Sequence, residues 1–258
     1  IPFCSNIKEF YLNLYEKAFS ILKHLLRSKQ MAFNIVQKID DKVQIKNVLI
    51  SLFDKTGLDT LVNGLIETCP GVKIYSTGGT YKAISELLGD QADKYLVSVS
   101  DYTGQPEMQG GLVKTLDFKI YLGILGEKYN DAHQSDLART DAVAFDMVAV
   151  NLYPFRQAIS QPDVTPELAR TNIDIGGPCM IRASAKNFIR VASVTDAADY
   201  PALLDELRSN NGALCLATRV KLMTKAFAHT ASYDTAIAAH FATLNPDKVG
   251  DTYADIIR

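Results

Sequence analysis

Three short segments of the chain combine glycine, hydroxyl groups and positive charge in a way that suits a phosphate group. Asp54-Lys55-Thr56-Gly57 offers an ammonium group and a hydroxyl, and Ser76-Thr77-Gly78-Gly79-Thr80 offers three hydroxyls around two glycines. Asp174-Ile175-Gly176-Gly177-Pro178 adds a second glycine pair, with a proline where the first turn of a helix accepts one. A helix that starts at such a turn presents free N–H groups and the positive end of its dipole to an anion. One turn of this kind is a common connector, but three predict a site for a monophosphate and neighbouring hydroxyls.

The chain lacks the two most specific nucleotide-binding patterns. Neither G-x-x-x-x-G-K-[ST] nor G-x-G-x-x-G occurs in it. These patterns mark the phosphate-binding loop of nucleotide triphosphatases and the dinucleotide-binding turn, so neither class of site is indicated.

Four further side chains are of types that transfer or stabilise protons. Lys114 follows a Gly-Gly turn, Tyr153 follows an apolar run, Asp174 opens the third glycine segment, and Lys186 closes the helix expected after it. Each has a structural explanation as well: Tyr153 packs before a proline, Asp174 caps a helix, and Lys186 complements a helix C-terminus. Taken singly, the four residues leave both interpretations open.

The elements that would position these residues alternate between strands and helices from about residue 45. Short β-branched runs predict strands at 48–53, 72–75, 96–99, 147–151 and 190–195, and apolar spacing of three and four predicts helices between them. The pattern predicts an α/β fold, a doubly wound and mostly parallel sheet covered on both faces. Ligands of such sheets bind at the carboxyl ends of the strands, where the glycine segments fall. A last helical segment, 216–241, carries one apolar stripe that suits either the core or a subunit interface.

Composition narrows the class of protein. The net charge of -2 and the isoelectric point near 6.1 argue against nucleic acid or an acidic membrane surface as a partner. No apolar run is long enough to cross a bilayer, and the scattered cysteines show neither a disulfide framework nor a metal-ligand spacing. We therefore expect a cytoplasmic protein without a metal site. Residues 1–44 read as an N-terminal extension that starts as a basic amphipathic stretch, 45–243 as the main domain and 244–258 as a tail.

The order of the segments resembles a known family, the N-terminal inosine-monophosphate (IMP) cyclohydrolase domain of the bifunctional purine-biosynthesis enzyme that also carries a transformylase domain. The resemblance runs from about residue 45 to 243. It implies a methylglyoxal-synthase-like fold, a homodimer, no cofactor, and the closure of formamido-imidazole-carboxamide ribotide to IMP with loss of water. A separate enzyme would carry out the formyl transfer that supplies this nucleotide substrate. The segments that carry the resemblance are Ser51–Gly57, Ser76–Thr80, Ser100–Gly104, Pro106–Met108, Val113–Leu116, Gly123–Gly126, Asn151–Phe155, Asn172–Pro178, Ala185–Asn187 and Lys225–Ala231.

The resemblance also implies roles for particular residues. Lys114 would polarise the formyl oxygen, where a fixed cation acts on developing charge. Asp174 and Lys186 would shuttle protons, and Tyr153 would hold or protonate the oxygen. The implied phosphate and ribose contacts are Lys55, Thr56, Thr77, Gly78, Gly79 and Thr80. The implied base-lining residues are Asn151, Ile175, Gly176 and Gly177, with Thr115 as a further substrate contact.

Several positions depart from the family pattern around Lys114, where the family usually reads Gly-Arg-Val-Lys-Thr-Leu-His-Pro. Leu112 stands where the family has an arginine, and Lys119 is the nearest cation that could take the place of that arginine. Two other functions stay open: a sensor that binds a purine nucleotide without turnover, and a methylglyoxal-synthase-like lyase acting on a triose phosphate. The departing residues are Leu112, Asp117, Phe118, Tyr121, Leu122 and Phe188.

Overall fold

The computed structural model describes residues 35–105 and 115–253. The chain divides into two compact units, Ile1–Lys38 and Ile39–Arg258, and every described helix and strand belongs to the second unit. Strand β1 (Lys42–Gln44) is therefore part of this larger unit, although its residues fall within the stretch expected to be an extension.

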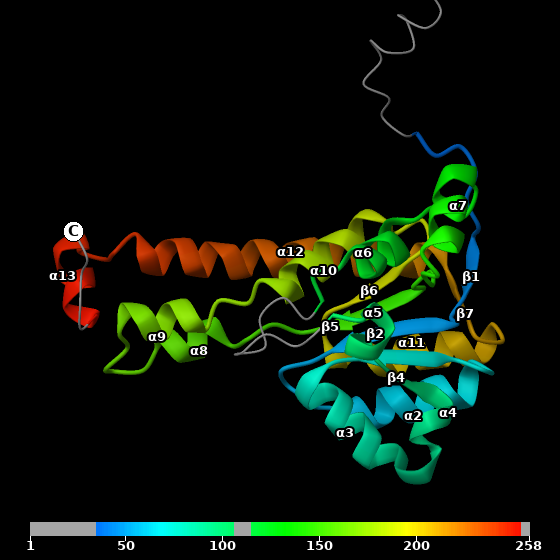
Figure 1. The fold of residues 1–258 in the computed structure, drawn as a ribbon, viewed down its shortest axis with the longest axis horizontal. Coiled ribbons are helices and arrows are strands. Elements are labelled where there is room, and N and C mark those ends of the chain that lie inside the picture. Colours follow the sequence, from blue (N-terminus) through cyan, green and yellow to red (C-terminus); the bar gives the residue numbers. More distant parts are fainter. Residues whose placement is uncertain (1–34, 106–114, 254–258) are drawn as a thin grey trace, which may run out of the picture. The chain divides into compact units, whose positions relative to one another are not determined.

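A five-stranded parallel sheet lies at the centre of the larger unit (Figure 1). Its strand order is β4-β3-β2-β5-β6, and every neighbouring pair is parallel. The five strands predicted from β-branched runs are confirmed, and so is the α/β class with a parallel sheet. Their bounds are Asn47–Ser51 (β2), Lys73–Ser76 (β3), Leu96–Ser98 (β4), Met147–Val150 (β5) and Ala192–Val194 (β6).

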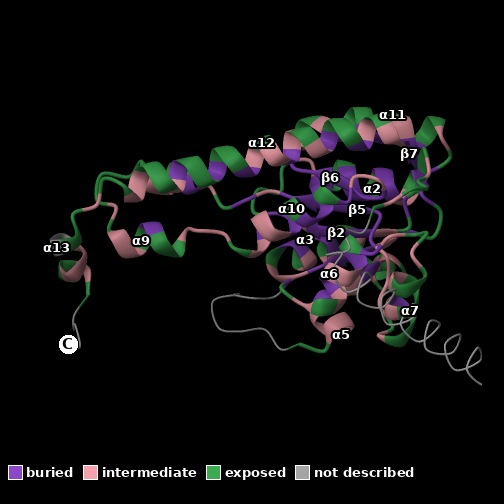
Figure 2. Ribbon diagram, turned by 90° about the horizontal axis from the view of Figure 1, so that it is seen from above, coloured by how far each residue is buried: buried purple, intermediate pink, exposed green. Residues whose placement is uncertain are grey.

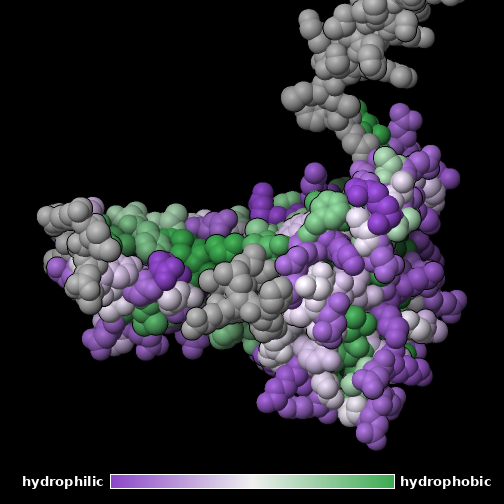
Figure 3. All heavy atoms as spheres, viewed as in Figure 1, coloured by the Kyte–Doolittle hydropathy of each residue, from purple (hydrophilic) through white to green (hydrophobic). Residues whose placement is uncertain are grey.

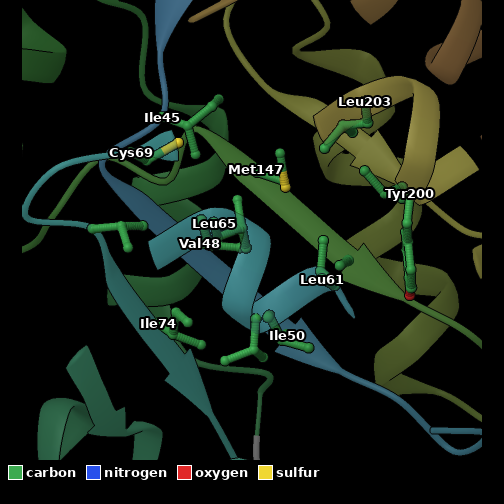
Figure 4. Packing of buried hydrophobic residues seen from close by; sticks show 14 of the residues in the cluster. Ile45, Val48, Ile50, Leu61, Leu65, Cys69, Ile74, Met147, Tyr200 and Leu203 are labelled. Atoms are coloured by element: carbon green, nitrogen blue, oxygen red, sulfur yellow. The ribbon is translucent and has the colours of Figure 1, made fainter. Parts of the chain in front are cut away.

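Alternating strand residues feed two separate cores, one on each face of the sheet. On one face, Val48 and Ile50 of β2 pack with Leu61 and Leu65 of α2 (Leu58–Thr68) (Figure 4). On the other face, Leu49 packs into the second core. The first core also takes residues of α3 (Gly78–Leu88) and α11 (Tyr200–Ser209), and the second takes residues of α6 (Phe118–Leu125), α10 (Gly176–Lys186) and α12 (Leu216–Phe241). Helices thus cover both faces, as the apolar strand runs predict.

The apolar stripe of α12 is used within this unit. Leu222 belongs to the first core and Ala226 to the second, and Met223 and Phe227 pack against the second core. Met223 and Phe227 of the predicted stripe thus pack against the core, whereas Val220 and Ala231 of the same stripe are exposed.

The C-terminal half of α12 carries two short helices beside it. Phe155, the first residue of α8 (Phe155–Ile159), makes ring contacts with Tyr233 and Phe241 of α12. Arg156 of α8 donates to the Ser232 carbonyl of α12 at 3.0 Å. Helix α9 (Pro166–Thr171) follows α8, and each of these two helices buries one residue in the second core, Phe155 of α8 and Ala169 of α9. Figure 2 shows the burial along the chain.

A second, two-stranded sheet joins the beginning of the larger unit to its later part. Strand β1 pairs antiparallel with β7 (Ala213–Cys215), and neither strand was predicted, because neither lies in a run of β-branched residues. The guanidinium of Arg219 is fully buried behind this sheet. It donates to five backbone carbonyls, those of Asp40, Asp41, Phe188, Ile189 and Leu214.

The remaining described elements are short connections. These elements are η1 (Gly89–Gln91), α4 (Ala92–Tyr95), α5 (Val99–Thr103), α7 (Asp131–Arg139), η3 (Ala197–Asp199), α13 (Pro246–Val249) and η4 (Gly250–Thr252).

No described helix has the length and apolar character needed to span a membrane.

Candidate active site

A cavity of about 360 Å³ opens at the carboxyl ends of β2 and β5. The chain runs outward from β2 to β3 and β4, then returns to place β5 on the other side of β2. This reversal of strand order is where ligands of parallel sheets bind, and the volume lies within the range of small-molecule sites. The lining residues are Ser51, Leu52, Phe53, Lys55, Thr77, Gly78, Gly79, Thr80, Thr115, Asn151, Tyr153, Thr171, Ile173, Asp174, Ile175, Gly176, Gly177 and Met180.

One end of the cavity suits an anion. The N-terminus of α3 opens there with Gly78 and Gly79, and Gly78 has a φ of +52°, which favours glycine. The Lys55 ammonium donates to the Phe53 carbonyl at 3.2 Å and lies 3.8 Å from where a Cβ on Gly79 would stand. A cation beside a helix N-terminus is a favourable arrangement for a phosphate group.

Two of the predicted hydroxyl contacts have other partners. The Thr80 hydroxyl donates to the Leu52 carbonyl at 2.9 Å and accepts from the Leu52 N–H at 3.0 Å, so it fixes the end of β2. The Thr56 hydroxyl donates to Asp54 at 2.7 Å, and Thr56 lines a neighbouring cavity rather than this one. Thr77, at the start of α3, does line the cavity.

A carboxyl group lies at the other end of the cavity, at the start of α10. Asp174 accepts hydrogen bonds from the N–H groups of Gly177, at 2.9 Å, and of Tyr153. Burial nevertheless raises the pKa of Asp174 above its ordinary value of 3.8, although these two hydrogen bonds lower it. A Cβ on Gly177 would stand 2.5 Å from Asp174 Oδ2 and 2.6 Å from Leu152, so only glycine fits there. A carboxylate whose pKa is raised by burial is a stronger base than an ordinary one, so Asp174 is a candidate for proton transfer.

Asn151 ties together the loops that follow β2 and β5. Its side-chain oxygen accepts from the N–H of Phe53 at 2.6 Å and of Asp54 at 3.2 Å. Its side-chain nitrogen donates to the Asp54 carbonyl at 2.6 Å. Asn151 lines the cavity as predicted, and its hydrogen bonds show that it also sets the spacing of the two loops.

Of the two lysines predicted to act on the reacting groups, the structure describes only Lys186. Lys114 lies outside the described residues, whereas the next residue, Thr115, is buried and lines the cavity. A Cβ on Gly176 would stand 2.8 Å from Thr115 Oγ1. Thr115 therefore packs against the first residue of α10 at a distance that favours glycine at position 176. Lys186 is exposed at the last position of α10, about 15 Å along the helix from Gly176. Lys186 is not among the lining residues, and its role in the reaction rests on the resemblance alone.

The departures from the family pattern have local explanations. Asp117 caps α6 by accepting from the Lys119 N–H at 2.7 Å. Burial raises the pKa of Tyr121, which is packed beside Cys179. The Lys119 ammonium lies 3.4 Å from the Tyr102 carbonyl and does not line the cavity, so Lys119 does not replace the family arginine there. Leu112 lies outside the described residues.

The sequence alone did not identify Phe53 as a site residue. Phe53 directly precedes the Asp54-Lys55-Thr56-Gly57 turn and lines the cavity. An apolar run that ends in phenylalanine reads as a buried strand, and the only warning was its position next to a polar turn.

The fold and the cavity together define an MGS-like α/β domain. Residues 57–179 match the family model of the MGS-like domain. The crystal structure of ForH is similar, with a TM-score of 0.67 and 29% sequence identity over 76% of this chain and 97% of that one.

Residues 184–256 match the family model of the AICARFT/IMPCHase bienzyme. The bifunctional purine biosynthesis protein PurH of Neisseria meningitidis serogroup C is 49% identical over 203 residues, which are 79% of this chain and 37% of the relative. PurH of Neisseria gonorrhoeae gives the same identity and coverage. The chain is thus similar to the bifunctional purine biosynthesis proteins, and it spans little more than a third of the length of these relatives.

Proposed function

We propose that this chain is an IMP cyclohydrolase, which closes 5-formamidoimidazole-4-carboxamide ribotide to IMP with release of water. The observation that carries the proposal is the arrangement within one cavity. Lys55 and the start of α3 line this cavity, and so do the half-buried Asp174 carboxyl and the Tyr153 side chain. A phosphorylated substrate with a reactive carboxamide at its far end needs both groups.

Orientation is the first contribution of such a site. Lys55, Thr77, Gly78 and Gly79 would hold the phosphate and ribose. Gly176 and Ile175 would lie along the base, since they open α10 at the opposite wall. Nucleophile and electrophile belong to one molecule, so holding them in contact removes a large part of the entropic barrier.

Asp174 is the proposed proton carrier. Its carboxylate would take a proton from the carboxamide nitrogen as this nitrogen forms a bond to the formyl carbon. The resulting carboxylic acid would then protonate the former formyl oxygen, which becomes a hydroxyl, and the carboxylate is regenerated. In a second step the formamide nitrogen would lose its proton to the carboxylate, and the carboxylic acid would pass this proton to the hydroxyl, which leaves as water as the C=N bond forms. Burial raises the pKa of Asp174, so its carboxylate is a stronger base than an ordinary aspartate for taking up the proton.

Tyr153 and the two lysines complete the proposal. The Tyr153 hydroxyl would hold the formyl oxygen as it gains charge. By the resemblance, Lys114 would polarise the same oxygen and Lys186 would assist proton transfer. A formyl-transfer step must precede this reaction, because the substrate is a formylated amine.

Turnover of the purified chain tests the proposal. The chain, treated with a chelator, is mixed with the formylated ribotide, and IMP formation is followed by ultraviolet absorbance without added folate. We expect turnover above the uncatalysed rate. Tight binding of IMP with no turnover would refute the enzyme proposal.

The departures around Lys114 favour one second candidate, a sensor that binds purine nucleotides. Asp117 caps α6 and Tyr121 packs against the second core, as expected if that segment did not serve catalysis. Isothermal titration with IMP alongside the turnover assay separates the two functions. A lyase acting on a triose phosphate would be recognised by turnover of dihydroxyacetone phosphate instead.

A further inference from the structure

Phe53 is a large apolar side chain that stays half exposed at a polar cavity. Its side chain is 52% exposed, whereas the preceding Leu52 is 5% exposed and belongs to the first core. Phe53 lines the cavity together with hydroxyl, glycine and amide groups. Packing of the core therefore does not explain why a phenyl ring stands there.

The Phe53 ring contacts the ring of Tyr153. The ring centroids are 5.4 Å apart with an interplanar angle of 61°, an edge-to-face arrangement. Tyr153 is itself 41% exposed. Phe53 follows β2 and Tyr153 follows β5, so the contact crosses the point where the strand order reverses. An exposed tyrosine has few neighbours to select one rotamer, and an edge-to-face partner supplies a preferred geometry.

Backbone hydrogen bonds fix both residues independently of this ring contact. The Phe53 N–H donates to Asn151, and the Phe53 carbonyl accepts from Lys55. The Tyr153 N–H donates to the Asp174 carboxylate. A substitution of the Phe53 side chain can therefore remove the ring contact and leave the loops in place.

We propose that Phe53 is a positioning residue whose ring holds the Tyr153 hydroxyl over the cavity. The inference rests on the proposed function, in which this hydroxyl acts on the formyl oxygen. Phe53 then acts through Tyr153 and does not bind the substrate itself.

Single variants give the first test. Phe53→Leu keeps an apolar side chain without a ring, and we expect kcat to fall by roughly 3- to 10-fold, the range of an edge-to-face contact, with KM within twofold. Phe53→Tyr keeps the ring and should retain kcat. Phe241→Leu is the matched control, because it removes a ring contact with Phe155 away from the cavity, and it should leave kcat unchanged. A rise in KM alone for Phe53→Leu would overturn the proposal in favour of direct substrate contact.

A double variant shows whether the effect passes through the hydroxyl. Tyr153→Phe removes the hydroxyl and keeps the ring, so adding Phe53→Leu should cause no further loss of kcat. The shift in melting temperature caused by Phe53→Leu should be the same in both backgrounds, because the ring packing is the same. A loss of kcat that persists in the Tyr153→Phe background would refute the positioning role.

A readout without turnover keeps the inference separate from the proposed reaction. In protein labelled with ¹³C-tyrosine, the ring resonance of Tyr153 is assigned by its loss in Tyr153→Phe. We expect Phe53→Leu to shift and broaden this resonance and Phe241→Leu to leave it unchanged. If the wild-type chain shows no turnover, the proposed function fails while this spectrum still decides whether Phe53 orders Tyr153. An unchanged resonance in Phe53→Leu overturns the inference whatever the activity.

Discussion

Burial and hydrogen bonding have opposing effects on the pKa of a carboxyl group that lines the cavity. Asp174 is the clearest case, since burial disfavours its carboxylate and two backbone N–H groups favour it. Burial is the larger effect, so the pKa is raised. The same carboxyl group that suits proton transfer is therefore a source of instability once it is ionised.

Replacement of Asp174 by asparagine should separate activity from stability. We expect Asp174→Asn to lower kcat by at least about 100-fold, the low end of general acid–base catalysis. In the wild type, the folded state holds its proton to a higher pH than the unfolded state, so Asp174 reduces stability as pH rises from 3.8 through the raised pKa. Asp174→Asn cannot ionise at this position, so its free energy of unfolding lacks this pH-dependent decrease. Urea unfolding at several pH values should show the variant gaining relative to the wild type across that window and no further above it. A constant difference at all pH values would contradict the raised pKa.

The ascending limb of the pH–rate profile should report the same group. If Asp174 acts first as a base, kcat/KM of the wild type should fall as the pH is lowered through a pKa above 3.8. The limb should be absent from the residual activity of Asp174→Asn. A limb that survives the substitution would assign it to another group.

Lys55 should affect binding and not the chemical step. A cation that holds the phosphate equally in the ground state and the transition state changes KM and leaves kcat nearly constant. We expect Lys55→Ala to raise KM by about tenfold, the low end for a hydrogen bond to a charged group, because Lys55 is exposed. Lys82→Ala, on the exposed side of α3, is the control and should change neither constant.

Lys114→Ala should instead lower kcat, because a cation that acts on the developing charge serves the transition state. If Lys114→Ala and Lys55→Ala raised KM equally, Lys114 would be reassigned to binding.

At the scale of elements, Arg219 joins β1, β7 and the loop before β6 through five carbonyl groups. Arg219→Leu would leave these buried acceptors without their donor. We expect a loss of roughly 3–5 kcal/mol in the free energy of unfolding, as for a broken buried charge network. Arg208→Leu is the matched control, because Arg208 makes only surface ion pairs with Glu67 and Asp205 and should cost less than about 1 kcal/mol. Similar losses in both variants would show that the Arg219 network is dispensable.

Elements with a strong period were predictable from the sequence, and short or tertiary-dependent ones were not. The strand predicted at 147–151 is confirmed, because every residue of β5 is apolar. The helix predicted at 216–241 is confirmed, because its apolar spacing of three and four continues over several turns. Strands β1 and β7 have three residues each, and their pairing depends on distant partners. The three glycine segments supply half of the residues that line the cavity. The place of Lys186 was not predictable, because only the direction of α10 shows which end faces the cavity.

At the scale of the whole unit, a band of apolar residues runs along α12 (Figure 3). Met223 and Phe227 of the predicted stripe pack against the unit's own core, so we expect a homodimer to use the exposed residues of the stripe, such as Val220. We expect a homodimer by light scattering at micromolar concentration. Val220, which is exposed on α12, offers a test: Val220→Asp should weaken the dimer and keep the fold. A monodisperse wild-type monomer would remove the proposal.

The Arg219 network also constrains the order in which the chain can fold during synthesis. Arg219 donates to the Asp41 carbonyl across a separation of 178 residues. The beginning of the larger unit therefore cannot be secured until a ribosome has released the first turn of α12, which contains Arg219. Contacts of such long separation slow folding, because the loop between them must close first. Until then the edge of β1 has no partner strand, and a nascent chain is exposed there to pairing with other chains.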